Sequence, residues 1–213
     1  MMECRDQRTA EIDALAEAIA ARPPRSDFGS QEDRIQAAVC VPLHLGSKGL
    51  EVWAIKRTEA MRHHAGEIAF PGGKRDEGDV DLLHTALREM EEELGITRDQ
   101  VRVLGATGRV PTATSRFTLN PFVVVVAADT VPRPHAGEVA ALILMPFRDF
   151  FAGRVTYRAV EWAPGRLSPI FGFEVGSMYG ASAHVLDDLL RTYAELHGLP
   201  YPEPERTDRI PWI

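Results

Sequence analysis

The sequence predicts an α/β (α+β) sandwich in which strands and helices follow one another in a mixed order. Two observations support this fold class. Short apolar runs typical of strands recur along the 213 residues, and two long amphipathic segments, each ended by glycine, read as helices. The strands come in groups between the helices, whereas βαβ units would alternate one strand with one helix. With 45% hydrophobic and 26% charged residues, the chain has the composition of a globular protein.

The first third of the chain is predicted to be a helix followed by a β-hairpin. Residues 8–21 place apolar side chains on one stripe, and two consecutive prolines end this helix. The run 35–45 reads as a buried strand, and residues 50–57 read as its partner across a Gly-Ser-Lys-Gly turn. A short strand over 66–70 then leads into a Pro-Gly-Gly turn.

The clearest helix covers about residues 81–95, because four apolar residues share one stripe and Gly95 stops it. A second helix covers 181–198 and also ends at a glycine. The remaining strand-like runs are, in chain order, 101–108, 118–128, 138–147, 155–163 and 170–176. We therefore expect an N-terminal helical extension (1–30), one domain (31–198) and an irregular, Pro-rich C-terminal tail (199–213).

Charge and composition narrow the classes of function. The formal net charge is −7, whereas proteins that bind nucleic acids generally carry a basic surplus. The cysteines, Cys4 and Cys40, form no disulfide or metal-binding framework, and Cys40 reads as a buried free thiol. No apolar run approaches the ~18 residues of a membrane span, and the charged N-terminus lacks the apolar core of a signal peptide. We expect a cytoplasmic protein with neither nucleic acid nor membrane as partner.

Four glutamates crowd into residues 89–93 of the clearest helix, directly after Arg88. Like charges at helical spacing destabilise a helix, so the cluster calls for an explanation. Glu89 shares one face with Glu92 and Glu93, which follow it by three and four residues. Converging carboxylates suit a hard divalent cation, most commonly Mg²⁺, and such an ion would offset the repulsion. A solvated acidic face is the alternative.

The residues around the cluster favour the metal site and resemble a known motif. Residues 88–96, "REMEEELGI", resemble the Nudix box, R-E-U-x-E-E-x-G-U with U aliphatic, at each defined position. The first half of the box, G-x5-E-x7-R, is less regular. Gly73 and Asp79 fit it when one extra residue is allowed before Arg88.

One branch of that family, the coenzyme A pyrophosphatases, is similar at this departure and upstream of it. Its signature is K/R-R-S/T-x3-R-x-H-x-G-E-x-x-F-P-G-G, which residues 56–73, "KRTEAMRHHAGEIAFPGG", resemble throughout. Two elements differ from the branch: Ser115-Arg116-Phe117 replaces Ser-Gly-aromatic, and Tyr179-Gly180-Ala181-Ser182-Ala183 replaces Trp-Gly-x-Thr-Ala. Both lie where substrate choice could be set.

The resemblance implies a Nudix-type α/β/α sandwich with a mixed β-sheet and a catalytic loop–helix–loop. It implies that Mg²⁺ or Mn²⁺ is bound by Glu89 and Glu93, with Glu92 as a further ligand or as the residue that activates water. Arg88 would orient one of the glutamates through a bidentate pair. Glu138, at the start of a strand, is our candidate for a general base, and a plain strand-start carboxylate is the alternative.

A basic group and a glycine turn lie upstream of the box and could bind phosphates. The candidate substrate-binding residues are Arg57, Arg62, His64, Gly72, Gly73 and Lys74. Zinc is not expected, because the histidines have neither partner cysteines nor H-E-x-x-H spacing.

The resemblance implies a diphosphatase that cleaves coenzyme A or its derivatives to 3′,5′-ADP and 4′-phosphopantetheine. The first alternative is a Nudix hydrolase acting on another nucleoside diphosphate derivative, such as ADP-ribose or a dinucleotide. The second is a Nudix-fold ligand sensor without catalysis. Sensors often lose box carboxylates or gain a DNA-binding domain, and neither feature is apparent in this sequence. A homodimer is a further option, since dimers are common among Nudix proteins.

Overall fold

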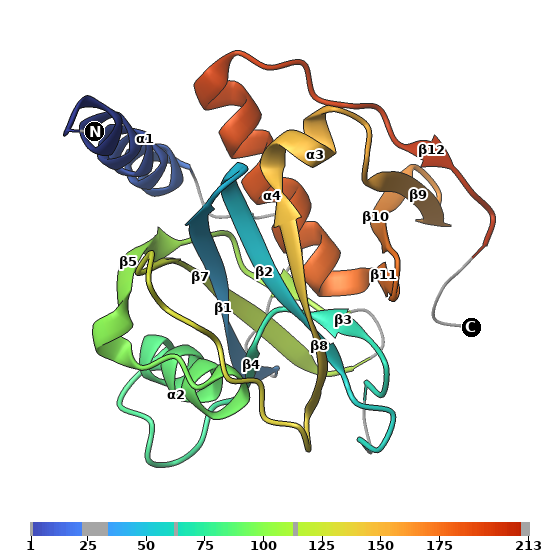
Figure 1. The fold of residues 1–213 in the computed structure, drawn as a ribbon. Helices are drawn as coiled ribbons and strands as arrows, with labels where there is room; N and C mark the ends of the chain where they lie inside the picture. Colours follow the sequence, from blue (N-terminus) through green and yellow to red (C-terminus); the bar gives the residue numbers. More distant parts are fainter. Residues whose placement is uncertain (1, 23–33, 62–63, 113–114, 210–213) are drawn as a thin grey trace.

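The computed structural model describes residues 2–22, 34–61, 64–112 and 115–209, with side chains from residue 9 onward (Figure 1). Its elements are, in chain order, α1 (Met2–Ala21), β1 (Ile35–Gly46), β2 (Gly49–Arg57), β3 (Ile68–Ala69), β4 (Gly72–Lys74), α2 (Leu82–Leu94), a 3₁₀ turn (Arg98–Gln100), β5 (Val101–Ala106), β6 (Val110–Pro111), β7 (Phe117–Val126), β8 (Val139–Pro146), α3 (Phe147–Phe151), β9 (Thr156–Ala163), β10 (Arg166–Phe173), β11 (Gly176–Met178), α4 (Gly180–His197) and β12 (Glu205–Arg206).

The centre of the fold is a mixed sheet of eight strands. Its main path is β3-β2-β1-β7-β5, while β8 pairs with β2, β4 with β1 and β6 with β7. The two central strands β1 and β7 run parallel, and the other pairs are antiparallel. A smaller sheet has the order β11-β10-β9-β12. In Figure 1 it lies beside α4, on the opposite side of the large sheet from α2.

The large sheet separates two apolar clusters because successive side chains of a strand point to opposite faces. In β1, Ala38 and Cys40 pack in the cluster that contains the apolar side of α2. Val39, Val41 and Leu43 pack in the other cluster, together with residues of α1, α3 and α4. The result is a layer of helix on each face of a mixed sheet, which confirms the predicted α/β/α sandwich.

Helix α2 begins and ends close to where the sequence predicts. The Asp81 carboxylate accepts a hydrogen bond from the His84 N–H at 2.7 Å, which satisfies one of the free donors of the first turn. At the other end Gly95 adopts φ 65° and donates its N–H to the Glu91 carbonyl at 2.8 Å. This left-handed conformation is readily adopted by glycine, so the glycine signal in the sequence was informative.

Several short elements were not predicted from the sequence, among them β4, α3 and β12. Residues 138–147 were assigned to one strand, but Phe147 begins the five-residue helix α3. The turn expected at Gly72 and Gly73 is instead a three-residue strand, β4, which pairs with β1. The tail, predicted to be irregular, contributes β12, which pairs with β9. Elements this short have no periodicity of their own and depend on a neighbouring strand or on packing.

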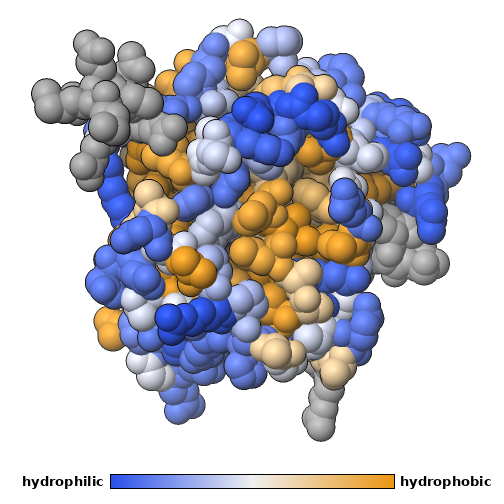
Figure 2. Space-filling model, in the orientation of Figure 1, coloured by the Kyte–Doolittle hydropathy of each residue, from blue (hydrophilic) through white to orange (hydrophobic). Residues whose placement is uncertain are grey.

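The surface has an apolar area on one side. Figure 2 shows it in the middle of the face on which β8 lies in Figure 1, and Leu144 of β8 is 51% exposed. Part of this end of the sheet is therefore open to solvent. None of the described helices is long and apolar enough to cross a membrane.

The environment of Cys40 allows a test of the fold. Its side chain has no exposed surface, and burial raises the pKa of the thiol to about 12. We expect Cys40 in a Cys4→Ser variant to resist iodoacetamide at mildly alkaline pH, because the thiolate is the reactive form. Mass spectrometry measures the labelling, and the same variant in concentrated urea should react fully. Rapid labelling without denaturant would contradict this placement in the core.

Candidate active site

The buried carboxylate of Glu93 joins α2 to two strands of the large sheet. The backbone N–H of Gly72 in β4 donates to Glu93 Oε2 at 2.9 Å. Arg57, the last residue of β2, donates from Nη1 to Glu93 Oε1 at 3.1 Å. The side chain of Glu93 is 1% exposed, so these partners offset most of its loss of hydration.

Two glycines let β4 lie between β1 and α2. A Cβ on Gly72 would stand 2.3 Å from the Ala38 carbonyl oxygen, and its φ of 155° disfavours other residues. A Cβ on Gly73 would stand 2.4 Å from Glu89 Oε1. The glycine backbone therefore approaches two helix carboxylates, Glu89 and Glu93, more closely than other residues would allow.

Burial and mutual repulsion make these carboxylates costly to ionise. Burial raises the pKa of Glu93 to about 7; Arg57 and the Gly72 N–H oppose that rise, and the charges of Glu89 and Glu138 add to it. Burial also raises the pKa of Glu89, and Arg88 opposes that change. A cation placed between such groups would favour their charged forms.

The arrangement fits a hard divalent cation with few protein ligands. Within the ranges that the structure describes, no three His, Cys, Asp or Glu side chains stand together as a complete metal cage. Glu89 and Glu93 nevertheless supply two carboxylates beside a glycine backbone, and all these donors are oxygen. Mg²⁺ is commonly held by one or two carboxylates and completes its shell with water and substrate phosphate. The donor set therefore suits Mg²⁺ or a similar ion.

Arg88 is fixed by a fully buried partner, Asp79. Arg88 donates from Nε to Asp79 Oδ1 at 3.0 Å and from Nη2 to Asp79 Oδ2 at 3.1 Å, a bidentate pair. Asp79 also accepts hydrogen bonds from the Asp76 N–H and the Thr85 hydroxyl, and its Oδ1 lies 2.9 Å from His84 Nδ1. Chiefly because of Arg88, the pKa of Asp79 lies well below its usual range.

The guanidinium of Arg88 also contacts two of the clustered glutamates. Its Nη1 lies 3.0 Å from Glu89 Oε1 and 3.1 Å from Glu92 Oε2. Glu92 is largely exposed and points to Arg88, whereas Glu89 and Glu93 face β4. Glu91 is exposed on the surface of the helix. The metal-binding and water-activating roles stay predictions.

The other predicted site residues lie at different distances from this centre. Glu138 is partly exposed and close enough to raise the pKa of Glu93, and its backbone carbonyl accepts the Thr58 N–H. Lys74 is exposed at the end of β4. His64 Nδ1 lies 3.0 Å from Glu67 Oε2. Arg62 lies outside the described residues.

Sequence reasoning assigned no role to two residues that the structure connects to the site. Asp79 was aligned with the glutamate of the box by the G-x5-D spacing, and its contacts now show that it holds Arg88. Glu67, within the upstream signature, hydrogen-bonds Tyr179 at the start of α4. Only the fold brings that pair together, since the two residues are far apart in the chain.

Comparisons with known proteins agree with the resemblance seen in the sequence. A family model described as the NUDIX domain matches residues 34–164. A protein of Pectobacterium atrosepticum named "Uncharacterized Nudix hydrolase NudL" is 39% identical over 117 residues, which are 55% of this chain and 60% of that protein. A protein of the same name from Yersinia enterocolitica is 41% identical over 91 residues, 43% of this chain and 46% of that one. The chain thus matches less than two thirds of each relative's length.

A solved structure is similar at the level of the fold. It is titled as a binary complex of a C. elegans Ap4A hydrolase and has a TM-score of 0.51. The match covers 77% of this chain and 98% of that chain at 14% identity. At such low identity the similarity supports the fold alone.

The Asp79–Arg88 pair gives a prediction about stability. Asp79→Asn should lower the free energy of unfolding by about 3 kcal/mol, because it leaves the Arg88 charge without its buried partner. The matched control is Asp76→Asn, whose exposed carboxylate lies 3.7 Å from Arg88 Nη2 and should contribute less than about 0.5 kcal/mol. Urea denaturation measures both.

The pH dependence of this difference follows from the lowered pKa of Asp79. A carboxylate with a lowered pKa stabilises the folded state fully above its unfolded pKa, about 3.9, and loses that contribution as the pH falls toward the folded pKa. The gap between the wild type and Asp79→Asn should therefore stay constant down to about pH 4 and shrink below it. Equal effects of the two substitutions at neutral pH would contradict the assignment.

Proposed function

This chain belongs to the Nudix family, and we propose that it is a metal-dependent diphosphatase that cleaves coenzyme A or its derivatives to 3′,5′-ADP and 4′-phosphopantetheine. The observation that carries the hydrolase proposal is the meeting of Glu89 and Glu93 with the glycine backbone of β4. A buried carboxylate and a partly buried one beside a glycine strand suit the binding of a divalent ion together with a diphosphate.

Each candidate residue has a separate role in the proposed reaction. Glu89 and Glu93 would hold Mg²⁺ or Mn²⁺, with Glu92 as a further ligand after it leaves Arg88. The bound ion supplies charge neutralisation on the phosphate oxygens and lowers the pKa of water. Arg57 and Arg88 keep the two carboxylates in place, and Asp79 keeps Arg88 in place. Glu138 is the proposed general base, because its carboxylate is partly exposed and within electrostatic reach of Glu93.

The coenzyme A proposal rests on the segment that leads into the glycines. Residues 56–73 resemble the signature of that branch, and Arg57 within this segment contacts Glu93. We propose that Arg62, His64 and Lys74 help to bind the phosphates of the substrate. Hydrolysis of ADP-ribose or a dinucleotide is the alternative, and a ligand sensor is the second one. The complete set of carboxylates argues against a sensor, because a sensor needs no metal-binding glutamates.

The first test is the identification of products from a panel of diphosphates. We expect coenzyme A to be hydrolysed in the presence of Mg²⁺ or Mn²⁺ and not in excess chelator, while far-UV circular dichroism stays unchanged without metal. Dephospho-coenzyme A should bind more weakly if basic residues recognise the 3′-phosphate. Faster hydrolysis of ADP-ribose would favour the alternative enzyme, and binding without hydrolysis of any compound would favour the sensor.

Substitutions of two neighbouring glutamates test which face of α2 binds the ion. Glu93→Gln should lower kcat by a factor of ~10² or more, about 2.7 kcal/mol, because it removes a charged ligand and keeps the shape. Glu91→Gln is the matched control, since Glu91 is rotated roughly 200° from Glu89 on the helix. It should change the rate by less than about threefold.

The same variants separate metal binding from folding. Glu93→Gln should bind Mn²⁺ more weakly when titration calorimetry is run without substrate, whereas Glu91→Gln should match the wild type. Thermal unfolding of both variants checks that the fold is intact. An equal loss of activity in the two variants would show that the face assignment is wrong.

A further inference from the structure

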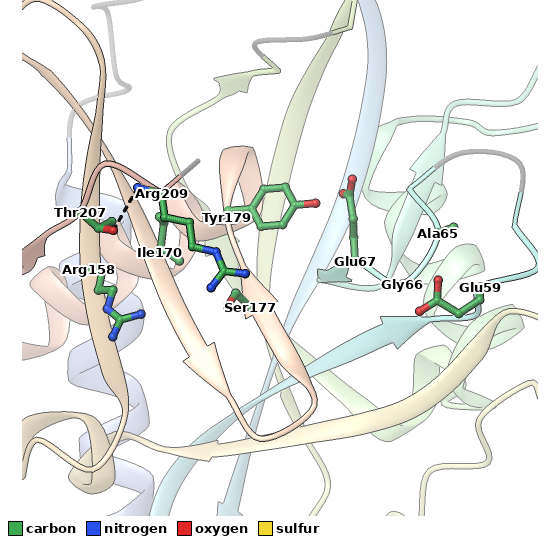
Figure 3. A pocket seen from close by; sticks show the side chains of 10 residues that line it. All are labelled: Glu59, Ala65, Gly66, Glu67, Arg158, Ile170, Ser177, Tyr179, Thr207 and Arg209. Atoms are coloured by element: carbon green, nitrogen blue, oxygen red, sulfur yellow. Dashed lines mark hydrogen bonds between the residues drawn. The ribbon is translucent and has the colours of Figure 1, made fainter. Parts of the chain in front are cut away.

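A polar cleft lies between the segment that precedes β3 and the small sheet. It has a volume of about 440 Å³, and none of the described candidate active-site residues lines it. Glu59 and residues 65–67 form one wall, and residues of β9, β10, β11 and the C-terminal tail form the other. Figure 3 shows Glu59 at one end, Arg158 and Arg209 at the opposite end, and Tyr179 between them.

The side chains that line the cleft include equal numbers of acidic and basic groups. Glu59 and Glu67 contribute two carboxylates, and Arg158 and Arg209 contribute two guanidinium groups. Arg158 already donates to the Glu205 carboxylate at 2.9 Å. A phosphate group would need unopposed cations, and here the carboxylates would repel it. Hydroxyl groups and small apolar side chains complete the lining, so an uncharged polar group is the better match.

Tyr179 places an aromatic ring and a hydroxyl group in the lining of the cleft. Its side chain points toward Glu67 in Figure 3, and its hydroxyl is hydrogen-bonded to that carboxylate. Glu67 Oε2 also lies 3.0 Å from His64 Nδ1. Through Glu67, residues 64–67 are connected to Tyr179 at the start of α4. The hydroxyl oxygen of Tyr179 can in addition accept a hydrogen bond.

The cleft is within reach of the proposed diphosphate site. The Arg57 N–H donates to the Glu67 carbonyl at 2.9 Å, while the guanidinium of the same Arg57 contacts Glu93. One arginine side chain therefore spans the separation between the backbone beside the cleft and Glu93, which accepts from the Gly72 N–H. A substrate arm of about twelve bonds has the length of four extended residues, ~14 Å, which is longer than an arginine side chain.

We propose that this cleft binds the part of the substrate that extends beyond the scissile diphosphate, and that it takes an uncharged arm bearing amides and hydroxyls. The pantetheine arm of coenzyme A has this chemistry, so the inference rests on the proposed function and names the subsite that would select for it. The amide and hydroxyl donors of the arm face Glu59 and Glu67, and its carbonyl groups accept from Ser177 or Arg209. The phosphates of the nucleotide stay outside the cleft.

The test compares coenzyme A with a diphosphate that lacks the arm, the methyl ester of 3′-phospho-ADP. Ser177→Trp fills the cleft, and Val175→Trp is the matched control, because Val175 is exposed in the same β10–β11 hairpin and does not line the cleft. Ser177→Trp should raise the KM for coenzyme A about tenfold or more and leave kcat/KM for the methyl ester within about twofold. Val175→Trp should change neither value. If Ser177→Trp fails to fold, Ser177→Leu is the smaller blocking variant.

Free pantetheine gives a second readout. It should inhibit coenzyme A hydrolysis by the wild type and by Val175→Trp, and it should lose this effect in Ser177→Trp. Equal kinetics of wild type and Ser177→Trp toward coenzyme A would overturn the cleft assignment and leave the diphosphatase intact. An equal loss on both substrates would overturn it as well, since blocking would then act on the common site. If the wild type hydrolyses neither compound, the proposed function itself fails.

Discussion

The close approach of β4 to α2 is the constraint on which the rest of the site depends. At Gly72 a side chain would collide with the β1 backbone, and at Gly73 it would collide with the Glu89 carboxylate. The absence of these two side chains lets one strand pair with β1 and donate an N–H to Glu93 at the same time. The carboxylates of a helix and the backbone of a strand thereby form one surface that is rich in oxygen.

That surface brings several negative charges together in a partly buried region. Arginines from two elements reduce the repulsion between these charges. Arg57 comes from the end of β2 and pairs with Glu93, while Arg88 comes from the helix itself and contacts Glu89 and Glu92. Arg88 is in turn held by Asp79, whose carboxylate accepts from several donors. The arginines position the carboxylates and reduce their repulsion, yet Glu89 and Glu93 each keep an oxygen near the glycines. We therefore expect the protein to fold without metal and still to attract a cation.

The segment between β2 and β3 connects this centre to the cleft. It begins at Arg57, which contacts Glu93, and it ends near Glu67, which contacts Tyr179 of the C-terminal part. A substitution in the small sheet or in the tail can therefore alter the position of Glu67 through its contact with Tyr179, without altering α2. This separation would let substrate choice vary while the hydrolytic centre stays the same, which agrees with functional sites being carried on loops over a rigid scaffold.

The sequence by itself determined the elements that carry their own signals. The amphipathic stripe and Gly95 located α2, the apolar runs located the long strands, and the spacing of Glu89, Glu92 and Glu93 indicated a metal site. Local patterns could not predict β4, α3 or β12, because such short elements exist only against their neighbours. The tertiary structure alone decided that Glu93 pairs with Arg57, that Glu92 turns to Arg88, and that Glu67 meets Tyr179. Periodicity reports which residues share a face, whereas the partner of a side chain depends on which distant segment the fold places beside it.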